Sequence, residues 1–284
     1  MTISVFYEHV IEAASQENMS IPEVLCHIKQ AGITGVELDR GRLAYDGKAE
    51  GYLKEAGISV HGLYQFFDFG YQHTKEDNKE GKALIDDAVR LGAQVLLIPG
   101  FIHEEDMDDE IRKEKKIHCE NPGIFPIVSN MADVINDIAS YARQNGVVIS
   151  MEDFDDCHSP IATAEGLLWF MGKVNGLTVA FDTGNFLYSE EPVLPALEKL
   201  LPYVAQVHLK DRGLNVNDGE YKETIAGRKL YPTAVGSGCI PMEDIIRCFQ
   251  DNGYDGNYAI EHFGSKHQLA DMLHSVEYIK KILA

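Results

Sequence analysis

VVISME, at residues 147–152, is a strand-like segment that ends in a carboxylate, and three later segments also carry a potential metal ligand at or near their ends. They are LTVAFD (177–182), VAQVHLK (204–210) and YAIEHF (258–263), and the potential ligands of the four are Glu152, Asp182, His208 and Glu261. A buried carboxylate has a large desolvation cost unless it is paired or binds a cation. In each segment, the residues two and four places before the potential ligand lie on the same side of the strand as that ligand. They are mostly small or slender, as the filled interior of a narrow barrel requires. The segments therefore predict a barrel whose rim carries a group of metal ligands.

Four more β-rich segments precede these, at residues 3–7, 34–39, 58–67 and 93–100. Amphipathic stretches lie between the segments, among them 21–32, 78–93, 127–146 and 241–256. Several such stretches end in a glycine just before the next strand, as a helix C-cap does; these are Gly32, Gly57, Gly92, Gly146, Gly176 and Gly253.

This alternation predicts the α/β class and a single (β/α)8 TIM barrel over residues 1–284, because eight βα units with nearly continuous apolar strands are typical of a closed parallel barrel. A doubly wound sheet is the alternative. It is disfavoured by the even eightfold count and by the absence of a GxGxxG turn after the first strand.

Two connections, 100–126 and 211–240, are too long to be simple turns. Both follow predicted strands and would project from the face on which barrel enzymes carry their active sites, where long loops often serve as lids. The run of mixed charges in 100–126 taken alone favours a solvated surface helix instead.

Composition and charge exclude several classes of protein. Among 284 residues, 45% are hydrophobic and the net charge is −20, so a sizeable core is expected and a nucleic-acid partner is disfavoured. The N-terminus lacks the pattern of a signal peptide, and no apolar run approaches the roughly 18 residues of a membrane span. The five cysteines show no CxxC spacing, which indicates reduced thiols in a cytoplasmic protein, with neither a disulfide framework nor a zinc site. Whether the chain forms a homo-oligomer is left open.

Spacing supports one shared site. The intervals of 30 residues from Glu152 to Asp182 and 26 from Asp182 to His208 each match one βα unit, and the 53 residues to Glu261 match one unit plus the second long connection. The four residues would then lie on strands five to eight, which are neighbours around half the rim. Three oxygens and one nitrogen favour one divalent ion such as Mn²⁺, Mg²⁺ or Co²⁺, and Zn²⁺ also fits.

Other polar residues near the predicted rim are candidates for substrate contacts. His61, in the third strand, would bind a hydroxyl or be a satisfied core residue. Glu37 would fill the barrel as a polar plug or reach the substrate. Lys210 shares the side of its strand with His208 and would polarise a carbonyl or bind a carboxylate, and Arg212 would add positive potential.

The segments MEDF, FDTGN, VHLKD, GSG and GYDGNYAIEHF resemble those of the xylose-isomerase-like barrel superfamily. More narrowly they are similar to its sugar phosphate isomerase/epimerase group, which includes ketose 3-epimerases, hydroxypyruvate isomerase and inosose dehydratase. The resemblance implies one divalent metal ion held by Glu152, Asp182, His208 and Glu261. It also implies that the substrate chelates this ion and that Glu152 and Glu261 flank the reacting carbon as an acid/base pair.

The chain departs from the ketose 3-epimerase pattern at three places. His158 stands where those enzymes have a second glutamate, and Asn185 stands where they have a histidine. Their substrate-binding arginine would fall at Leu214, close to Arg212. We therefore expect His158, Asn185 and Arg212 to contact the substrate, which would not be a free ketohexose.

Three functions follow for a small carbohydrate substrate. The first is a metal-dependent isomerase or epimerase of a small sugar, sugar phosphate or related polyhydroxy carbonyl compound, which removes the proton next to the carbonyl. The second is a lyase at the same site, dehydrating an inosose or a keto acid. The third, a barrel nuclease of the endonuclease IV type, is disfavoured by the acidic charge and by the lack of the further histidines that a three-zinc cluster needs.

Overall fold

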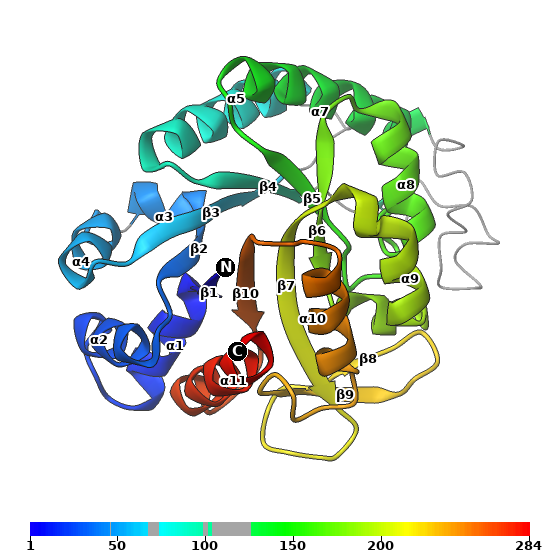
Figure 1. The fold of residues 1–284 in the computed structure, drawn as a ribbon. Coiled ribbons are helices and arrows are strands. Elements are labelled where there is room, and N and C mark those ends of the chain that lie inside the picture. The colour runs from blue at the N-terminus through cyan, green and yellow to red at the C-terminus, as the bar shows by residue number, and fades with distance from the viewer. Residues whose placement is uncertain (46, 68–73, 99–101, 104–125) are drawn as a thin grey trace. The chain divides into compact units, whose positions relative to one another are not determined.

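The structure is a computed structural model that describes residues 1–45, 47–67, 74–98, 102–103 and 126–284 (Figure 1). These residues divide into two compact units. Unit 1 comprises 1–62 and 206–284, and unit 2 comprises 63–205. The boundaries fall inside two strands, β3 (Ser59–Phe66) and β7 (Val204–Gly213), so the start of β3 and most of β7 belong to unit 1.

In unit 1, β1 pairs in parallel with both β2 and β10, and β10 pairs in parallel with β7. Beyond the parallel strands, β7 continues into an antiparallel ladder with β9, and β9 pairs with β8. The elements of this unit besides β3 and β7 are β1 (Thr2–Phe6), α1 (Tyr7–Gln16), α2 (Ile21–Ala31), β2 (Gly35–Asp39), α3 (Arg40–Tyr45), α4 (Ala49–Ala56), β8 (Lys222–Glu223), β9 (Lys229–Thr233), α10 (Met242–Asp251), β10 (Asn257–Glu261) and α11 (Gln268–Leu283).

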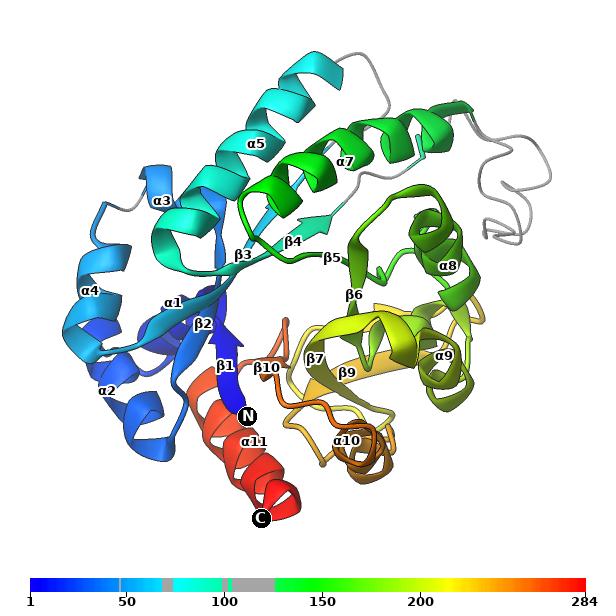
Figure 2. The same ribbon diagram turned by 45° about the horizontal axis from the view of Figure 1, so that its top comes forward.

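Helix α2 shows how local sequence sets the helix ends. Ser20 and Glu23 form a capping box, in which the Ser20 hydroxyl accepts from the Glu23 N–H and the Glu23 carboxylate accepts from the Ser20 N–H. Gly32 ends the helix with a φ of 100°, a left-handed conformation that glycine adopts without strain. The buried side of α2 then packs against α1 and α11, which lie beside it (Figure 2).

In unit 2, β5 pairs in parallel with both β4 and β6. Helices α5 and α7 pack side by side, and α8 packs against α9 (Figure 1). The elements are α5 (Thr74–Leu91), β4 (Gln94–Ile98), α7 (Pro126–Gln144), β5 (Ile149–Glu152), α8 (Ala164–Lys173), β6 (Leu177–Asp182), α9 (Val193–Leu200) and the 3-10 helices η3 (Asn185–Ser189) and η4 (Leu201–Tyr203).

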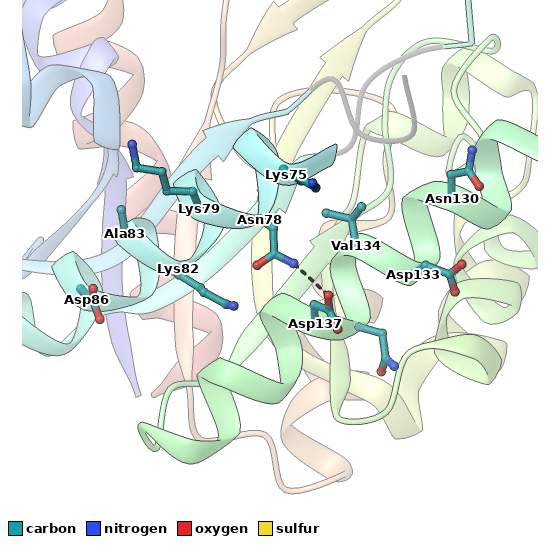
Figure 3. Close-up of a pocket in the computed structure, with 11 residues that line it drawn as sticks. Lys75, Asn78, Lys79, Lys82, Ala83, Asp86, Asn130, Asp133, Val134 and Asp137 are labelled. Atoms are coloured by element: carbon teal, nitrogen blue, oxygen red, sulfur yellow. Dashed lines mark hydrogen bonds between the residues drawn. The ribbon is translucent and has the colours of Figure 1, made fainter. Parts of the chain in front are cut away.

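A polar groove of about 970 Å³ lies between α5 and α7 (Figure 3). Lysines of α5, including Lys75 and Lys82, face aspartates of α7 across it, and Asn78 Nδ2 donates to Asp137 Oδ2 at 2.9 Å. Charges of both signs line the groove, and it contains none of the residues that the sequence singles out. We therefore interpret it as a polar groove between two packed helices and not as the predicted site.

All eight predicted strands are present, with ends shifted by three residues or fewer. The six glycines expected before strands all have positive φ. The prediction that Gly176 is a helix C-cap is wrong. Helix α8 ends at Lys173 with Val174 as its C-cap, and Gly176 lies in the turn beyond it.

The two long connections have different outcomes. Residues 100–126 lie outside the described part of the chain except for 102–103 and 126, so the prediction for them stays a prediction. The connection 211–240 carries the end of β7 together with β8 and β9 and is partly a small antiparallel sheet. Among the helices that the structure describes, none is long and apolar enough to cross a membrane.

Candidate functional site

Unit 2 presents two of the predicted ligands on one side of its sheet. Glu152, the last residue of β5, lies opposite Ala180 of β6. Because side chains two positions apart in a strand point to the same side, Asp182 shares the side of Ala180 and thus of Glu152. Both are buried, with exposed fractions of 5% for Glu152 and 0% for Asp182. We call these two residues the β5–β6 pair.

Hydrogen bonds to the backbone fix the orientation of Asp182. Its Oδ1 accepts from the N–H groups of Gly184 and Asn185 at 2.7 and 2.8 Å. The N–H of Asp182 donates to Oδ1 of the neighbouring Asp153 at 2.8 Å, and Asn185 Nδ2 donates to the Asp153 carbonyl at 2.7 Å. Supporting contacts of this kind hold a ligand in place before an ion arrives.

Unit 1 presents the other two predicted ligands together with a lysine. His208 lies opposite Ala259, and Lys210 lies opposite Glu261, so all three polar side chains share one side of the β7–β10 ladder. Glu261 Oε1 lies 2.5 Å from Lys210 Nζ, and Glu261 Oε2 lies 3.9 Å from His208 Nδ1. Their exposed fractions are between 1 and 4%. We call these three residues the β7–β10 group.

The charge state of Glu261 follows from these neighbours. Burial acts to raise the pKa of its carboxyl, but Lys210 and His208 act more strongly in the opposite direction and hold the pKa below its ordinary value. The carboxylate is therefore ionised at neutral pH although it is buried. An ionised carboxylate is the form that binds a cation or removes a proton.

Aromatic rings wall the β7–β10 group on one side. The ring of Phe6 meets the imidazole of His208 edge-on at a centroid distance of 5.2 Å, and Phe263 packs on Phe6 at 5.5 Å. His9 extends this wall and accepts the N–H of His262 through Nε2 at 3.1 Å. An apolar wall lowers the local dielectric and strengthens each charge interaction beside it.

Two of the predicted substrate contacts, Lys210 and Arg212, bond to other residues of unit 1. The ammonium of Lys210 is bonded to Glu261, so it orients that carboxylate. Arg212 is 4% exposed, and its guanidinium donates to the Phe263 carbonyl at 3.1 Å. This bond ties β7 to the segment after β10 and gives Arg212 a positioning role in this structure.

The two predicted contacts in unit 2 differ from each other. Asn185 is 2% exposed and belongs to the support of Asp182 and Asp153 described above. His158 is partly exposed, and its Nδ1 lies 3.1 Å from Asp156 Oδ1. Of the two, His158 has the accessibility that a substrate contact needs.

His61 lies beside the start of β10, away from Glu261 at the end of that strand. Its Nδ1 is 3.0 Å from Oδ1 of Asn257, the first residue of β10, and Asn257 Nδ2 donates to Ser4 and to Glu37. Asn257 precedes Glu261 by four strand residues, a separation of roughly 13 Å at the usual rise. The network favours the reading of Glu37 as a polar plug and of His61 as its hydrogen-bond partner.

Two supporting aspartates were not among the site residues predicted from the sequence. Asp153 holds the backbone of Asp182, as described above. Asp211 is buried and accepts from the N–H groups of Arg212, Gly236, Gly238 and Ile240 at 2.8 to 3.4 Å. Burial raises the pKa of Asp211, although its four donors favour the charged form. The available signal was that each aspartate directly follows a strand segment carrying a candidate ligand or lysine.

The four predicted ligands are three carboxylates at strand ends and one imidazole within β7, all buried, and this donor set could hold a metal ion. The chain is thus a βα-repeat protein whose later strands carry buried acidic and histidine side chains. The model of the Xylose isomerase-like TIM barrel family matches residues 26–282, so the chain belongs to this family. Its fold is a single (β/α)8 TIM barrel, and the predicted fold class and family resemblance are both confirmed.

The chain is also similar to individual known proteins. An inosose dehydratase from Clostridium beijerinckii is 26% identical over 193 residues, which cover 66% of this chain and 63% of that protein. The matched part thus spans less than two thirds of that relative. The IOLI protein, solved with a zinc atom, has a TM-score of 0.67 at 17% identity, with 100% of this chain and 96% of that one covered. The 3-keto-D-glucoside 4-epimerase YcjR from E. coli has a TM-score of 0.66 at 13% identity, with 99% of each chain covered. These two likenesses show the fold alone.

Proposed function

We propose that the protein is an enzyme that removes the proton next to the carbonyl group of a small polyhydroxy carbonyl compound, with one divalent ion bound by Glu152, Asp182, His208 and Glu261. The observation that carries this proposal is the β7–β10 group, in which a buried carboxylate stays ionised beside a lysine and a histidine. Three of the four ligands, Glu152, Asp182 and Glu261, are the last residues of their strands, and active sites of the TIM barrel fold lie at the carboxyl ends of its strands.

The donor set fits a hard or borderline cation, such as Mn²⁺, Mg²⁺, Co²⁺ or Zn²⁺. When bound, such a cation would neutralise the negative charge that develops on the carbonyl oxygen as the proton leaves. A neighbour in the same fold carries zinc, which supports a cation in this chain as well.

Residues of the chain would transfer the proton, orient the base and anchor the cation. Glu261 and Glu152 are the candidates for taking the proton and for returning it, since both are buried carboxylates at strand ends. Lys210 orients Glu261 and keeps it charged. Asp182, fixed through its Oδ1, serves as an anchor for the cation.

Two outcomes follow proton removal. Return of the proton to another position or face gives an isomerase or epimerase, and the two glutamates support this outcome. Loss of a neighbouring hydroxyl gives a dehydratase, and the inosose dehydratase relative supports that outcome. We place the enzyme in the cytoplasm as part of the same proposal.

The test is a screen of inososes, ketoses, ketose phosphates and keto acids in D₂O, read by NMR with Mn²⁺, Mg²⁺, Co²⁺ or Zn²⁺ added. Deuterium that enters the carbon next to the carbonyl marks the common step. A stereoisomer or positional isomer carrying that deuterium identifies an epimerase or isomerase, and an unsaturated product with loss of water identifies a dehydratase. If no compound in the screen exchanges a proton with any of the ions, the proposal is wrong.

A further inference from the structure

A second group of potential metal ligands lies in the turn after β5, in unit 2. Asp156, Cys157 and His158 each offer one ligand atom, and these three atoms lie within 4.8 Å of one another. We call these three residues the 156–158 turn. It shares no residue with the four ligands of the proposed function, and it was not predicted from cysteine spacing because it contains a single cysteine.

Backbone hydrogen bonds hold the 156–158 turn in shape. The N–H of His158 donates to Asp156 Oδ1 at 2.8 Å, and the N–H of Ser159 donates to the Asp156 carbonyl at 2.9 Å. Just outside the turn, the N–H of Phe154 donates to the carbonyl of Ile161 at 3.2 Å and closes the loop. The three side chains are thus presented from a fixed backbone, which lowers the ordering cost of binding an ion.

The distances suit a small ion. A tetrahedral site with bonds of about 2.0 to 2.3 Å separates its ligand atoms by roughly 3.3 to 3.8 Å. His158 Nδ1 and Asp156 Oδ1 are 3.1 Å apart, and the sulfur of Cys157 lies within 4.8 Å of a ligand atom of each of these residues. The Asp156 and His158 side chains are 36 and 33% exposed, so an ion can enter and water can complete its coordination.

We propose that the 156–158 turn binds a borderline divalent cation of the Zn²⁺ type through a thiolate, an imidazole nitrogen and a carboxylate oxygen. On binding, the Cys157 thiol loses its proton to solvent and the sulfur binds the ion as thiolate. A thiolate selects Zn²⁺ or Co²⁺ over Mg²⁺ and Mn²⁺, which prefer oxygen ligands. Three protein ligands with open positions for water are typical of an exchangeable zinc site.

Cobalt distinguishes this site from the one at the strand ends, because only the 156–158 turn supplies sulfur. Titration of the metal-free protein with Co²⁺ should produce a near-ultraviolet sulfur-to-cobalt charge-transfer band. The band should disappear in Cys157→Ser. It should persist in Asp182→Asn, which alters the other site, and in the matched control Cys248→Ser, whose cysteine is also partly exposed and outside any disulfide. Asp156→Asn and His158→Ala should weaken Co²⁺ binding by about tenfold or more.

A second measurement needs no variant. Zn²⁺, but not Mg²⁺, should slow alkylation of Cys157 by iodoacetamide at least tenfold while leaving Cys248 unchanged, as read by peptide mass spectrometry. The proposal is overturned if the wild-type protein shows no charge-transfer band, if the band survives in Cys157→Ser, or if Zn²⁺ gives Cys157 no protection. Loss of the band in Asp182→Asn with retention in Cys157→Ser would also overturn it, whereas absence of enzyme activity would not affect it.

Discussion

At the scale of single residues, Glu261 combines burial with a full negative charge. Its exposed fraction is 4%, and Lys210 and His208 keep its pKa below the ordinary value against the effect of burial. Apolar side chains of similar volume often stabilise a fold as well as a buried ion pair does, so the buried charge supports the proposed role of Glu261.

Replacement of Glu261 by Gln tests its role as a base. Gln keeps the size and one coordinating oxygen but cannot take a proton, so turnover and deuterium uptake should fall by a factor on the order of 10² or more. The content of bound metal should largely persist. Wild-type turnover with full metal occupancy in Glu261→Gln would show that another group moves the proton.

Replacement of Lys210 by Met tests the electrostatic coupling. The pKa of Glu261 is depressed in the folded state, so its ionisation adds stability above the pKa of the unfolded chain, and this stability is lost as the pH falls through the folded pKa. Without Lys210, the buried negative charge of Glu261 loses the positive charge that compensates it. We expect the free energy of unfolding of the metal-free protein to drop by about 3 kcal/mol at pH 7 and by less at pH 4.

Urea denaturation with a chelator at the two pH values measures this difference. The matched control is Lys266→Met, since Lys266 forms an exposed ion pair with Glu220. Its cost should stay below about 1 kcal/mol at both pH values. Equal losses in the two variants would contradict the assigned coupling.

At the scale of elements, Asp211 joins the end of β7 to the segment that precedes α10. Its carboxylate accepts from Gly236 and Gly238 at 3.0 and 2.8 Å. A Cβ at Gly238 would lie 2.1 Å from Asp211 Oδ1, so the close approach requires glycine. The GSG sequence at 236–238 is therefore explained by an internal carboxylate, without an external anion.

Replacement of Asp211 by Ala should release this segment. We expect a loss of about 2 to 4 kcal/mol in the free energy of unfolding, because several buried N–H groups lose a charged acceptor. Amides of 236–240 should exchange with solvent faster by at least tenfold. Asp218→Ala, at an exposed aspartate, is the control and should change neither quantity appreciably. Unchanged exchange in Asp211→Ala would refute the assigned role.

At the scale of the whole molecule, binding of the proposed ion is coupled to folding. An ion that binds only the folded state adds stability that grows with its concentration, by about 2.7 kcal/mol at one hundred times the dissociation constant. Protein loaded with Mn²⁺ or Co²⁺ should therefore melt at a higher temperature than protein treated with a chelator.

The variant Asp182→Asn should lose most of this metal-dependent shift, with affinity weakened by at least about tenfold, because the anchoring carboxylate loses its charge. Calorimetry and elemental analysis measure both effects. To leave the 156–158 turn empty, the titration uses Mn²⁺, which thiolates bind poorly. An unchanged Mn²⁺ shift in Asp182→Asn would place the cation elsewhere.

The sequence by itself determined the barrel and its four candidate ligands. Strand periodicity, apolar runs and βα spacing are local and repeated eight times, so errors at single ends left the order of elements intact. Residues such as Glu152 and Glu261 were conspicuous because a carboxylate at the end of an apolar strand contradicts the burial pattern around it. That contradiction is visible without coordinates.

Only the tertiary structure decided which polar side chains meet. The bond of Lys210 to Glu261 depends on the register of β10 against β7, and the placement of His61 beside Asn257 depends on packing between residues far apart in the chain. Asp211 reaches Gly238 across 27 residues, and no spacing rule predicts such a contact. A one-residue change of register would turn each side chain to the other face, so these partners are set by the cooperative packing of the sheet.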